Sequence, residues 1–165
     1  MNRFNVKQVA VLGAGVMGAQ IAAHLVNLRV PVILFDLGAA EGPKSAIAMR
    51  AIENLKKLKP APLGVPEDAV LIGQANYEEH LEQLRDCDLI IEAIAERMDW
   101  KLDLYTKIAP FIAPHAIVAS NTSGLSITKL GAALPVVNFT ISGSESPRTR
   151  LPRSSNYLAN QTLMP

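Results

Sequence analysis

Three glycines in residues 13–18 (Gly-Ala-Gly-Val-Met-Gly) and an aspartate, Asp36, have types and spacing that could bind a nucleotide. Glycine lets the backbone turn sharply and approach a ligand closely, and the free N–H groups that begin a helix can bind phosphate oxygens. A carboxylate at the later position can accept hydrogen bonds from the hydroxyls of an adenosine ribose. These residues therefore predict a site for the pyrophosphate and ribose of a dinucleotide.

The elements around these residues follow the order that such a site requires. An apolar run at 9–12 predicts a buried strand before the glycines, and residues 17–26 show a helical pattern after them. A second apolar run, at 30–35, ends directly before Asp36. The negative charge of Asp36 would repel the 2′-phosphate of NADP, so the sequence favours NAD as the cofactor.

Each residue of the glycine segment has its own predicted role. Gly13 allows the tight turn, Gly15 lets the backbone approach the pyrophosphate, and Gly18 lets the helix pack against the strand. Val16 and Met17 begin the helix and belong to the same predicted cofactor-binding set. The alternative is a glycine-rich turn in another kind of α/β protein.

Length, composition and charge limit the class of protein. The chain has 165 residues, of which 49% are hydrophobic and 19% charged, with a net charge of +1. These values are typical of one soluble globular domain, and we expect no nucleic-acid partner. We find no signal peptide and no apolar run of about 18 residues, so we expect no membrane segment. The single cysteine, Cys87, fits a reducing, cytoplasmic compartment, and we interpret it as a core residue rather than a catalytic thiol.

Beyond Asp36 the predicted elements continue to alternate. They are a helix at 42–59, a strand at 70–72, a helix at 77–84, a strand at 88–94, a helix at 99–108, a strand at 116–119 and a helix at 126–134 with a serine N-cap. This alternation predicts an α/β fold with a doubly wound parallel sheet of the Rossmann type, whose ligands bind at the carboxyl ends of the strands. The helix at 99–108 is amphipathic, with Trp100, Leu104 and Ile108 on one side.

Four parts of the chain together form a more specific pattern: VAVLGAGVMG at 9–18, Asp36, IIEAIAE at 90–96 and ASNTS at 119–123. In these parts the chain resembles the 3-hydroxyacyl-CoA dehydrogenases of fatty-acid β-oxidation. The first occurs in many dehydrogenases, whereas the last two at this separation are more specific. The resemblance extends over about residues 6–134. It implies oxidation of an (S)-3-hydroxyacyl-CoA to the 3-ketoacyl-CoA, with NAD accepting the hydride.

The resemblance also implies roles for individual residues. Glu96 and Lys101 correspond to positions that contact the cofactor, and Ser123 corresponds to an active-site serine that binds the 3-oxygen of the substrate or the nicotinamide. Without the resemblance, Glu96 and Lys101 would be interpreted as solvated charges on a loop and a first helical turn. Asn121 is interpreted as a turn-shaping residue. No metal site is expected.

The residues after Leu134 depart from the family pattern. The family has a catalytic histidine in a Gly-x-His-Phe-x-Asn-Pro segment, followed by a glutamate, and neither is found here. Residues 142–165 hold no sustained apolar run, which predicts a disordered or loosely attached tail. We therefore divide the chain into an NAD-binding domain at 1–134 and an atypical polar tail at 135–165. A shift of reading frame near Val136 is an alternative origin of the tail.

Two expectations follow for the activity and assembly of the chain. We expect the sheet to be incomplete at its C-terminal edge, the helical C-terminal domain of the family to be absent and catalysis to be lost. An exposed strand edge invites self-association, so we expect a homo-oligomer, with an acyl-CoA substrate as the other partner. The alternatives are another hydroxyacid dehydrogenase, against which the Ser-Asn-Thr-Ser segment argues, and a non-catalytic NAD-binding or dimerising module.

Overall fold

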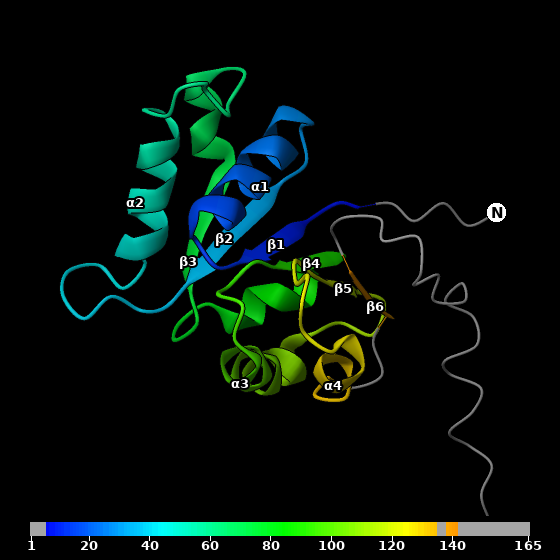
Figure 1. Ribbon diagram of the computed structural model, residues 1–165. Helices are drawn as coiled ribbons and strands as arrows, with labels where there is room; N and C mark the ends of the chain where they lie inside the picture. The colour runs from blue at the N-terminus through cyan, green and yellow to red at the C-terminus, as the bar shows by residue number, and fades with distance from the viewer. Residues whose placement is uncertain (1–5, 135–137, 142–165) are drawn as a thin grey trace, which may run out of the picture.

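The computed structural model describes residues 6–134 and 138–141 as alternating strands and helices (Figure 1). In chain order the elements are β1 (Val9–Leu12), α1 (Val16–Asn27), β2 (Val32–Asp36), α2 (Ala46–Leu55), the 3-10 helix η1 (Pro66–Leu71), β3 (Ile72–Asn76), the 3-10 helix η2 (Leu81–Asp86), β4 (Leu89–Glu92), α3 (Met98–Ile108), the 3-10 helix η3 (Ala109–Phe111), β5 (Ile117–Ser120), α4 (Ile127–Gly131) and β6 (Asn138–Ile141).

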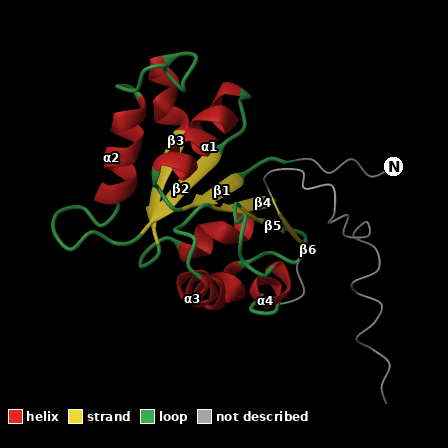
Figure 2. Cartoon of the chain, in the orientation of Figure 1, coloured by secondary structure: helices red, strands yellow, loops and turns green. Residues whose placement is uncertain are grey.

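The strands form one six-stranded sheet in the order β3-β2-β1-β4-β5-β6, visible in yellow in Figure 2. Every neighbouring pair is parallel. The chain runs from β1 outward to β3 and then returns to the other side of β1 with β4. This reversal makes the carboxyl ends of β1 and β4 the switch point of the strand order, which is where doubly wound sheets bind ligands, and we refer to this edge as the crevice. The predicted doubly wound fold is confirmed.

Helices cover both faces of the sheet and create two cores. α1 and α2 lie on one face, and α3 and α4 lie on the other (Figure 1). The alternation of side chains along a strand divides β1 between them. Val9 and Val11 pack under α1 and α2, whereas Ala10 and Leu12 pack on the side of α3. All four residues are fully buried, which explains the uninterrupted apolar sequence of this central strand.

The region between β2 and β4 differs most from its predicted form. The helix predicted at 42–59 is shorter, and the strand predicted at 70–72 instead begins at Ile72, after the 3-10 helix η1. Pro66 occupies the first turn of η1, a position that proline tolerates because its missing N–H has no partner there. The apolar residues at the end of η1 resemble the apolar run of a strand, so the predicted strand began two residues before β3.

The strand β6 corrects the predicted end of the sheet. Its residues pair in parallel with β5, with Asn138 opposite Ile117 and Ile141 opposite Ser120. The sheet therefore continues past Leu134 with a strand that the sequence analysis did not predict. A four-residue strand is held by backbone hydrogen bonds to its neighbour, so no long apolar run marked it in the sequence. The predicted tail at 142–165 lies outside the described residues.

The buried face of α3 also differs from the predicted one. Leu104 and Ile108 are buried as expected, but Trp100 is 50% exposed and lies under the guanidinium of Arg97, 4.6 Å from its ring centroid. Lys101 is fully buried in its place. The buried side of the helix therefore includes Lys101 in place of Trp100, because a buried partner carboxylate, described below, neutralises the charge of Lys101.

Cys87 is fully buried, which confirms its interpretation as a core residue. Burial, together with smaller contributions from Asp86 and Asp88, raises the pKa of its thiol to about 12. Because the thiolate is the reactive form, we expect Cys87 in the folded protein to resist alkylation by iodoacetamide at about pH 8, where an ordinary thiol is partly ionised. Mass spectrometry should find one added group only after unfolding in urea. Equal labelling rates with and without urea would contradict this expectation.

Candidate functional site

The glycine turn joins β1 to α1 at the crevice, and two of its glycines have no room for a side chain. Gly13 has a φ of +106°, and a Cβ there would lie 2.9 Å from the carbonyl oxygen of Ala93. A Cβ on Gly18 would collide with the carbonyl oxygen of Gly13. The Gly13 N–H donates to the carbonyl of Phe35 at 2.8 Å, so the turn is fixed to the end of β2. These close contacts agree with the roles predicted for Gly13 and Gly18.

The middle glycine borders open space instead. Nothing lies within 4 Å of the position that a Cβ on Gly15 would occupy. Gly15 is the N-cap of α1, and neither a capping side chain nor an acidic residue occupies the first turn of this helix. Val16 and Met17, which follow, are 75% and 52% exposed. Free N–H groups at the start of a 12-residue helix, beside empty space, form a surface suited to an anion.

Asp36 lies at the carboxyl end of β2 and is joined to the glycine turn. One oxygen of its carboxylate, Oδ2, accepts a hydrogen bond from the Ala14 N–H at 2.6 Å, and the other, Oδ1, accepts one from the Leu37 N–H at 2.7 Å. The fold thus brings together the glycines and the aspartate that are separated in the sequence. The carboxylate is half-buried and keeps lone pairs for further donors.

The side chain of Glu92, at the carboxyl end of β4, is the centre of a buried polar cluster. Its Oε1 accepts hydrogen bonds from the Lys101 Nζ at 2.6 Å and from the Ile94 N–H at 2.8 Å. Its Oε2 accepts from the Lys101 Nζ at 2.7 Å, the Ser120 Oγ at 2.6 Å and the Tyr105 hydroxyl at 3.1 Å. The Glu92 and Lys101 side chains are both 0% exposed. The ion pair with Lys101 therefore joins α3 to the end of β4, and the hydrogen bond from Ser120 joins β5 to the same carboxylate.

Lys101 does not have the environment that the sequence suggested. The alternative of a solvated charge is wrong, because the ammonium is buried against both oxygens of Glu92. Its Nζ also lies 3.6 Å from the Oε2 of Glu96. A direct contact with a cofactor would require this ammonium to leave its buried partner, so the arrangement favours a role in positioning Glu96.

Glu96 holds the loop that follows β5. Its Oε1 accepts hydrogen bonds from the Thr122 Oγ1 at 2.5 Å and from the N–H groups of Ser123 and Gly124, each at 3.0 Å. Partial burial raises the pKa of the Glu96 carboxyl, but these three hydrogen bonds and the nearby charge of Lys101 outweigh it and lower the pKa to about 2. Glu96 and Ser123, which are far apart in the sequence, are thus brought together.

The segment from Ser120 to Ser126 has a different role at each position. The Asn121 N–H donates to the Glu92 carbonyl at 2.8 Å, which continues the pairing of β5 with β4. Ser123 is exposed at the crevice. Ser126 caps α4 by accepting a hydrogen bond from the Lys129 N–H at 3.4 Å, which confirms the predicted serine N-cap.

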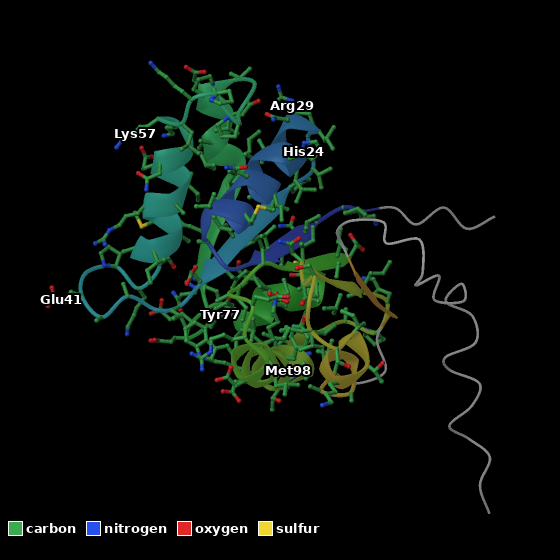
Figure 3. The ribbon with its side chains drawn as sticks, viewed as in Figure 1. His24, Arg29, Glu41, Lys57, Tyr77 and Met98 are labelled. Carbon is green, nitrogen blue, oxygen red and sulfur yellow. The ribbon has the colours of Figure 1, made fainter. Side chains whose placement is uncertain are left out.

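Tyr77 lies near the site, although no pattern in the sequence singled it out. Its ring stacks on Phe35 with centroids 6.0 Å apart, and the side chain is buried directly after β3 (Figure 3). Its hydroxyl is the one buried side-chain oxygen without a hydrogen-bond partner in the described part of the chain. Burial, followed by the charges of Asp36 and Glu92, raises its pKa well above the usual range. The backbone of Gly13 opposes this rise in the pKa, so the hydroxyl of Tyr77 lies close to the glycine turn.

Two other kinds of feature do not occur in the described residues. None of their His, Cys, Asp and Glu side chains gather in a group of three or more that could hold a metal ion. None of their helices is both long and apolar enough to cross a membrane.

Comparisons with known proteins agree with this geometry. A family model described as "3-hydroxyacyl-CoA dehydrogenase, NAD binding domain" matches residues 8–138. A putative fatty acid oxidation complex trifunctional enzyme of Rickettsia felis is 44% identical over 131 residues, which are 79% of this chain and 18% of that protein. A probable 3-hydroxyacyl-CoA dehydrogenase of Deinococcus radiodurans is 40% identical over 121 residues, which are 73% of this chain and 35% of that protein.

Solved structures give the same result. The crystal structure of 3-hydroxybutyryl-CoA dehydrogenase from Escherichia coli K12 superposes with a TM-score of 0.64 at 29% identity, over 79% of this chain and 28% of that one. The (S)-3-hydroxybutyryl-CoA dehydrogenase of Ralstonia eutropha superposes with a TM-score of 0.62 at 27% identity, over 79% and 46%. The chain thus spans well under two thirds of the length of these relatives.

The buried ion pair predicts a non-additive effect on stability. Replacing Lys101 with Met leaves the Glu92 carboxylate buried without its counter-charge, and we expect a loss of about 3–5 kcal/mol in the free energy of unfolding. The double variant Glu92→Gln/Lys101→Met removes both charges and should recover part of this loss. Urea unfolding followed by circular dichroism measures both. A double variant no more stable than Lys101→Met would contradict the assignment.

The lowered pKa of Glu96 predicts how its loop responds to acid. A group whose pKa falls on folding contributes stability above its unfolded value, and that contribution is lost as the pH drops towards the folded value. For Glu96 this window runs from 4.5 down to about 2. In ¹⁵N NMR titrations, the amide shifts of Ser123 and Gly124 should therefore stay constant from neutral pH to about 3.5. A midpoint near 4.5 would refute the assignment, and Glu96→Gln should abolish any titration of these two amides.

Proposed function

Because this chain belongs to the 3-hydroxyacyl-CoA dehydrogenase family, through its NAD-binding domain, we propose that it binds NAD across the carboxyl edge of its sheet. The observation that carries the proposal is the hydrogen bond between the Ala14 N–H and the Asp36 carboxylate. It joins the predicted pyrophosphate site to the predicted ribose site at the crevice between β1 and β4.

The glycine turn is suited to the pyrophosphate. The open space over Gly15 admits phosphate oxygens to the first N–H groups of α1, and the exposed side chains of Val16 and Met17 border the same space. Gly13 and Gly18 keep the helix close to β1, so that its N-terminus stays directed at the crevice. No acidic side chain in the first turn opposes an anion there.

Asp36 is suited to the adenosine ribose. Its carboxylate already accepts two backbone N–H groups and can accept hydroxyl groups with its remaining lone pairs. A ribose diol would gain two charge-assisted hydrogen bonds, whereas a 2′-phosphate would meet a like charge. We therefore assign NAD rather than NADP as the cofactor.

Glu96, Lys101 and Ser123 are assigned to the nicotinamide half of the site. Glu96 fixes the backbone of Ser123, and Lys101 lies behind Glu96 on the buried side. The exposed hydroxyl of Ser123 can donate to the carboxamide of the nicotinamide or to the 3-oxygen of a substrate. When bound, NAD would supply the hydride acceptor for oxidation of a secondary alcohol.

The reaction of the whole protein is part of the same proposal. We infer an oxidoreductase that converts (S)-3-hydroxyacyl-CoA to 3-ketoacyl-CoA in fatty-acid oxidation, acting in the cytoplasm as a homo-oligomer. The support is the set of relatives named above, of which this chain matches 18% and 35% of the length in the two curated cases. The chain on its own would then supply the cofactor half of the enzyme.

A second candidate is an NAD-binding module without turnover of its own. It is favoured by the positions of the histidines. The sequence has three, at 24, 80 and 115, and none of them follows Leu134, where the family pattern has its catalytic histidine. A base that removes the hydroxyl proton must lie within hydrogen-bond reach of the substrate. His80 accepts a hydrogen bond from the Asn76 N–H, and His115 lies 3.4 Å from Asp88, a residue just before β4 at the opposite end of the sheet from the crevice.

Calorimetric titration with NAD tests the cofactor site, and Asp36 provides matched variants. Asp36→Asn keeps an acceptor for the Ala14 N–H but loses the charge, whereas Asp36→Ala loses both. Hydrogen bonds to a charged group contribute about 1.5–3 kcal/mol, so Asp36→Ala should raise the Kd about tenfold to a hundredfold. Asp36→Asn should raise it by less.

An acetoacetyl-CoA and NADH turnover assay on the same samples separates the two candidates. NAD binding that weakens in the order wild type, Asp36→Asn, Asp36→Ala, without turnover, supports a cofactor domain alone. Turnover would assign the full activity to this chain. Binding that is unchanged in both variants would contradict the assignment of Asp36.

A further inference from the structure

The loop between Asp36 and α2 lies against the residues that follow β3. β2 and β3 are parallel, with Asp36 opposite Asn76, so the residues after each strand continue side by side. A Cβ on Gly38 would overlap the carboxylate of Glu78. A second carboxylate, that of Glu78, therefore rests on the backbone two residues beyond Asp36.

Glu78 also binds the one positively charged residue of this loop. Residues 37–45 read Leu-Gly-Ala-Ala-Glu-Gly-Pro-Lys-Ser, in which Lys44 is the only cation. Its Nζ lies 2.8 Å from the Oε2 of Glu78, and about half of each side chain is exposed. The hydrogen bond and the charge of each partner raise the pKa of Lys44 and lower that of Glu78. Lys44 is therefore charged, and its charge is neutralised locally.

The backbone of the loop keeps Lys44 in this position. The Ala39 N–H donates to the Lys44 carbonyl at 2.9 Å, which closes the loop on itself. Ser45, the N-cap of α2, accepts a hydrogen bond from the side chain of Asn76, a fully buried residue, at 3.0 Å. Glu41 lies at the outer edge of the molecule (Figure 3). The pair of Lys44 and Glu78 thus joins this loop to the residues that directly follow β3.

We propose that Glu78 is a second determinant of selectivity for NAD over NADP, acting together with Asp36. This inference rests on the assignment of the ribose site to Asp36. A 2′-phosphate bound there would need a nearby cation, which NADP-binding sites of this fold provide as an arginine. Glu78 pairs with Lys44, the one cation of the loop that could otherwise bind the phosphate, so that residues 37–45 offer no unpaired positive charge there. Asp36 acts by contact with the ribose, and Glu78 acts through the charge of the loop.

The pair can be altered without loss of the fold, because exposed ion pairs contribute little to stability. This makes the net charge of the pair an experimental variable. Glu78→Gln changes it from zero to +1, Lys44→Met changes it to −1, and the double variant returns it to zero. The matched control is Glu53→Gln, which removes an exposed partner of Lys56 at the same 2.8 Å distance, near the other end of α2.

Fluorescence titration of each full-length variant with NADH and NADPH tests the inference. We expect Glu78→Gln to bind NADPH about fivefold more tightly than the wild type, as one charge near a phosphate implies. Its affinity for NADH should change less than twofold. Lys44→Met should weaken NADPH binding, and the double variant should return to the wild-type value. The gain should shrink as salt is raised, because exposed charges are screened.

The possible failures are distinct. An unchanged NADPH affinity in Glu78→Gln, or an equal gain in NADH affinity, would overturn the inference while leaving the NAD site intact. A gain of the same size in Glu53→Gln would also overturn it, because the effect would then reflect the overall charge of the protein. Absence of NADH binding to the wild type would overturn both this inference and the proposed cofactor site.

Discussion

The buried carboxylate of Glu92 is the constraint on which the rest of the site depends. A charge that is 0% exposed is stable only when it is paired and hydrogen-bonded, so Glu92 requires Lys101 from α3 and Ser120 from β5. Meeting this requirement fixes the start of α3 beside the end of β4. Lys101 in turn lies 3.6 Å from Glu96, which holds Ser123. The buried charge of Glu92 is thus linked through three successive contacts to the exposed residue Ser123.

The exit of β4 links this cluster to the glycine turn. The Ile94 N–H donates to Glu92, and the carbonyl of the preceding residue, Ala93, lies where a side chain on Gly13 would be. The two halves of the site therefore meet at two consecutive residues. This contact explains why the turn must have glycine at position 13: the backbone after β4 approaches too closely for any Cβ. The glycine turn and the Glu92 cluster are thus joined through the residues that follow β4.

The charges at this edge follow a common pattern. Each carboxylate has a specific partner: Glu92 has an ammonium, Glu96 has a hydroxyl and two backbone N–H groups, and Asp36 has two backbone N–H groups. Glu78 has the ammonium of Lys44. Acidic groups that are already neutralised or hydrogen-bonded leave the edge suited to neutral hydroxyl groups. The open N-terminus of α1, which has no acidic residue in its first turn, is suited to negative charge, and the pyrophosphate is assigned there.

The sequence by itself determined the alternating elements, the parallel sheet and the ends of the strands at which ligands bind. It did so because Val9, Val11 and their neighbours must be buried on both faces, and because Gly13 and Gly18 have few structural alternatives. It could not determine which charges are buried. Lys101 and Trp100 are adjacent in the sequence, and hydrophobicity favours burial of the tryptophan. Lys101 is buried instead, because its ammonium pairs with the buried carboxylate of Glu92. Nor could it place Glu78 against Gly38, Tyr77 against Phe35, or β6 beside β5. Those contacts join residues far apart in the chain, and only the packing of the whole sheet brings them together.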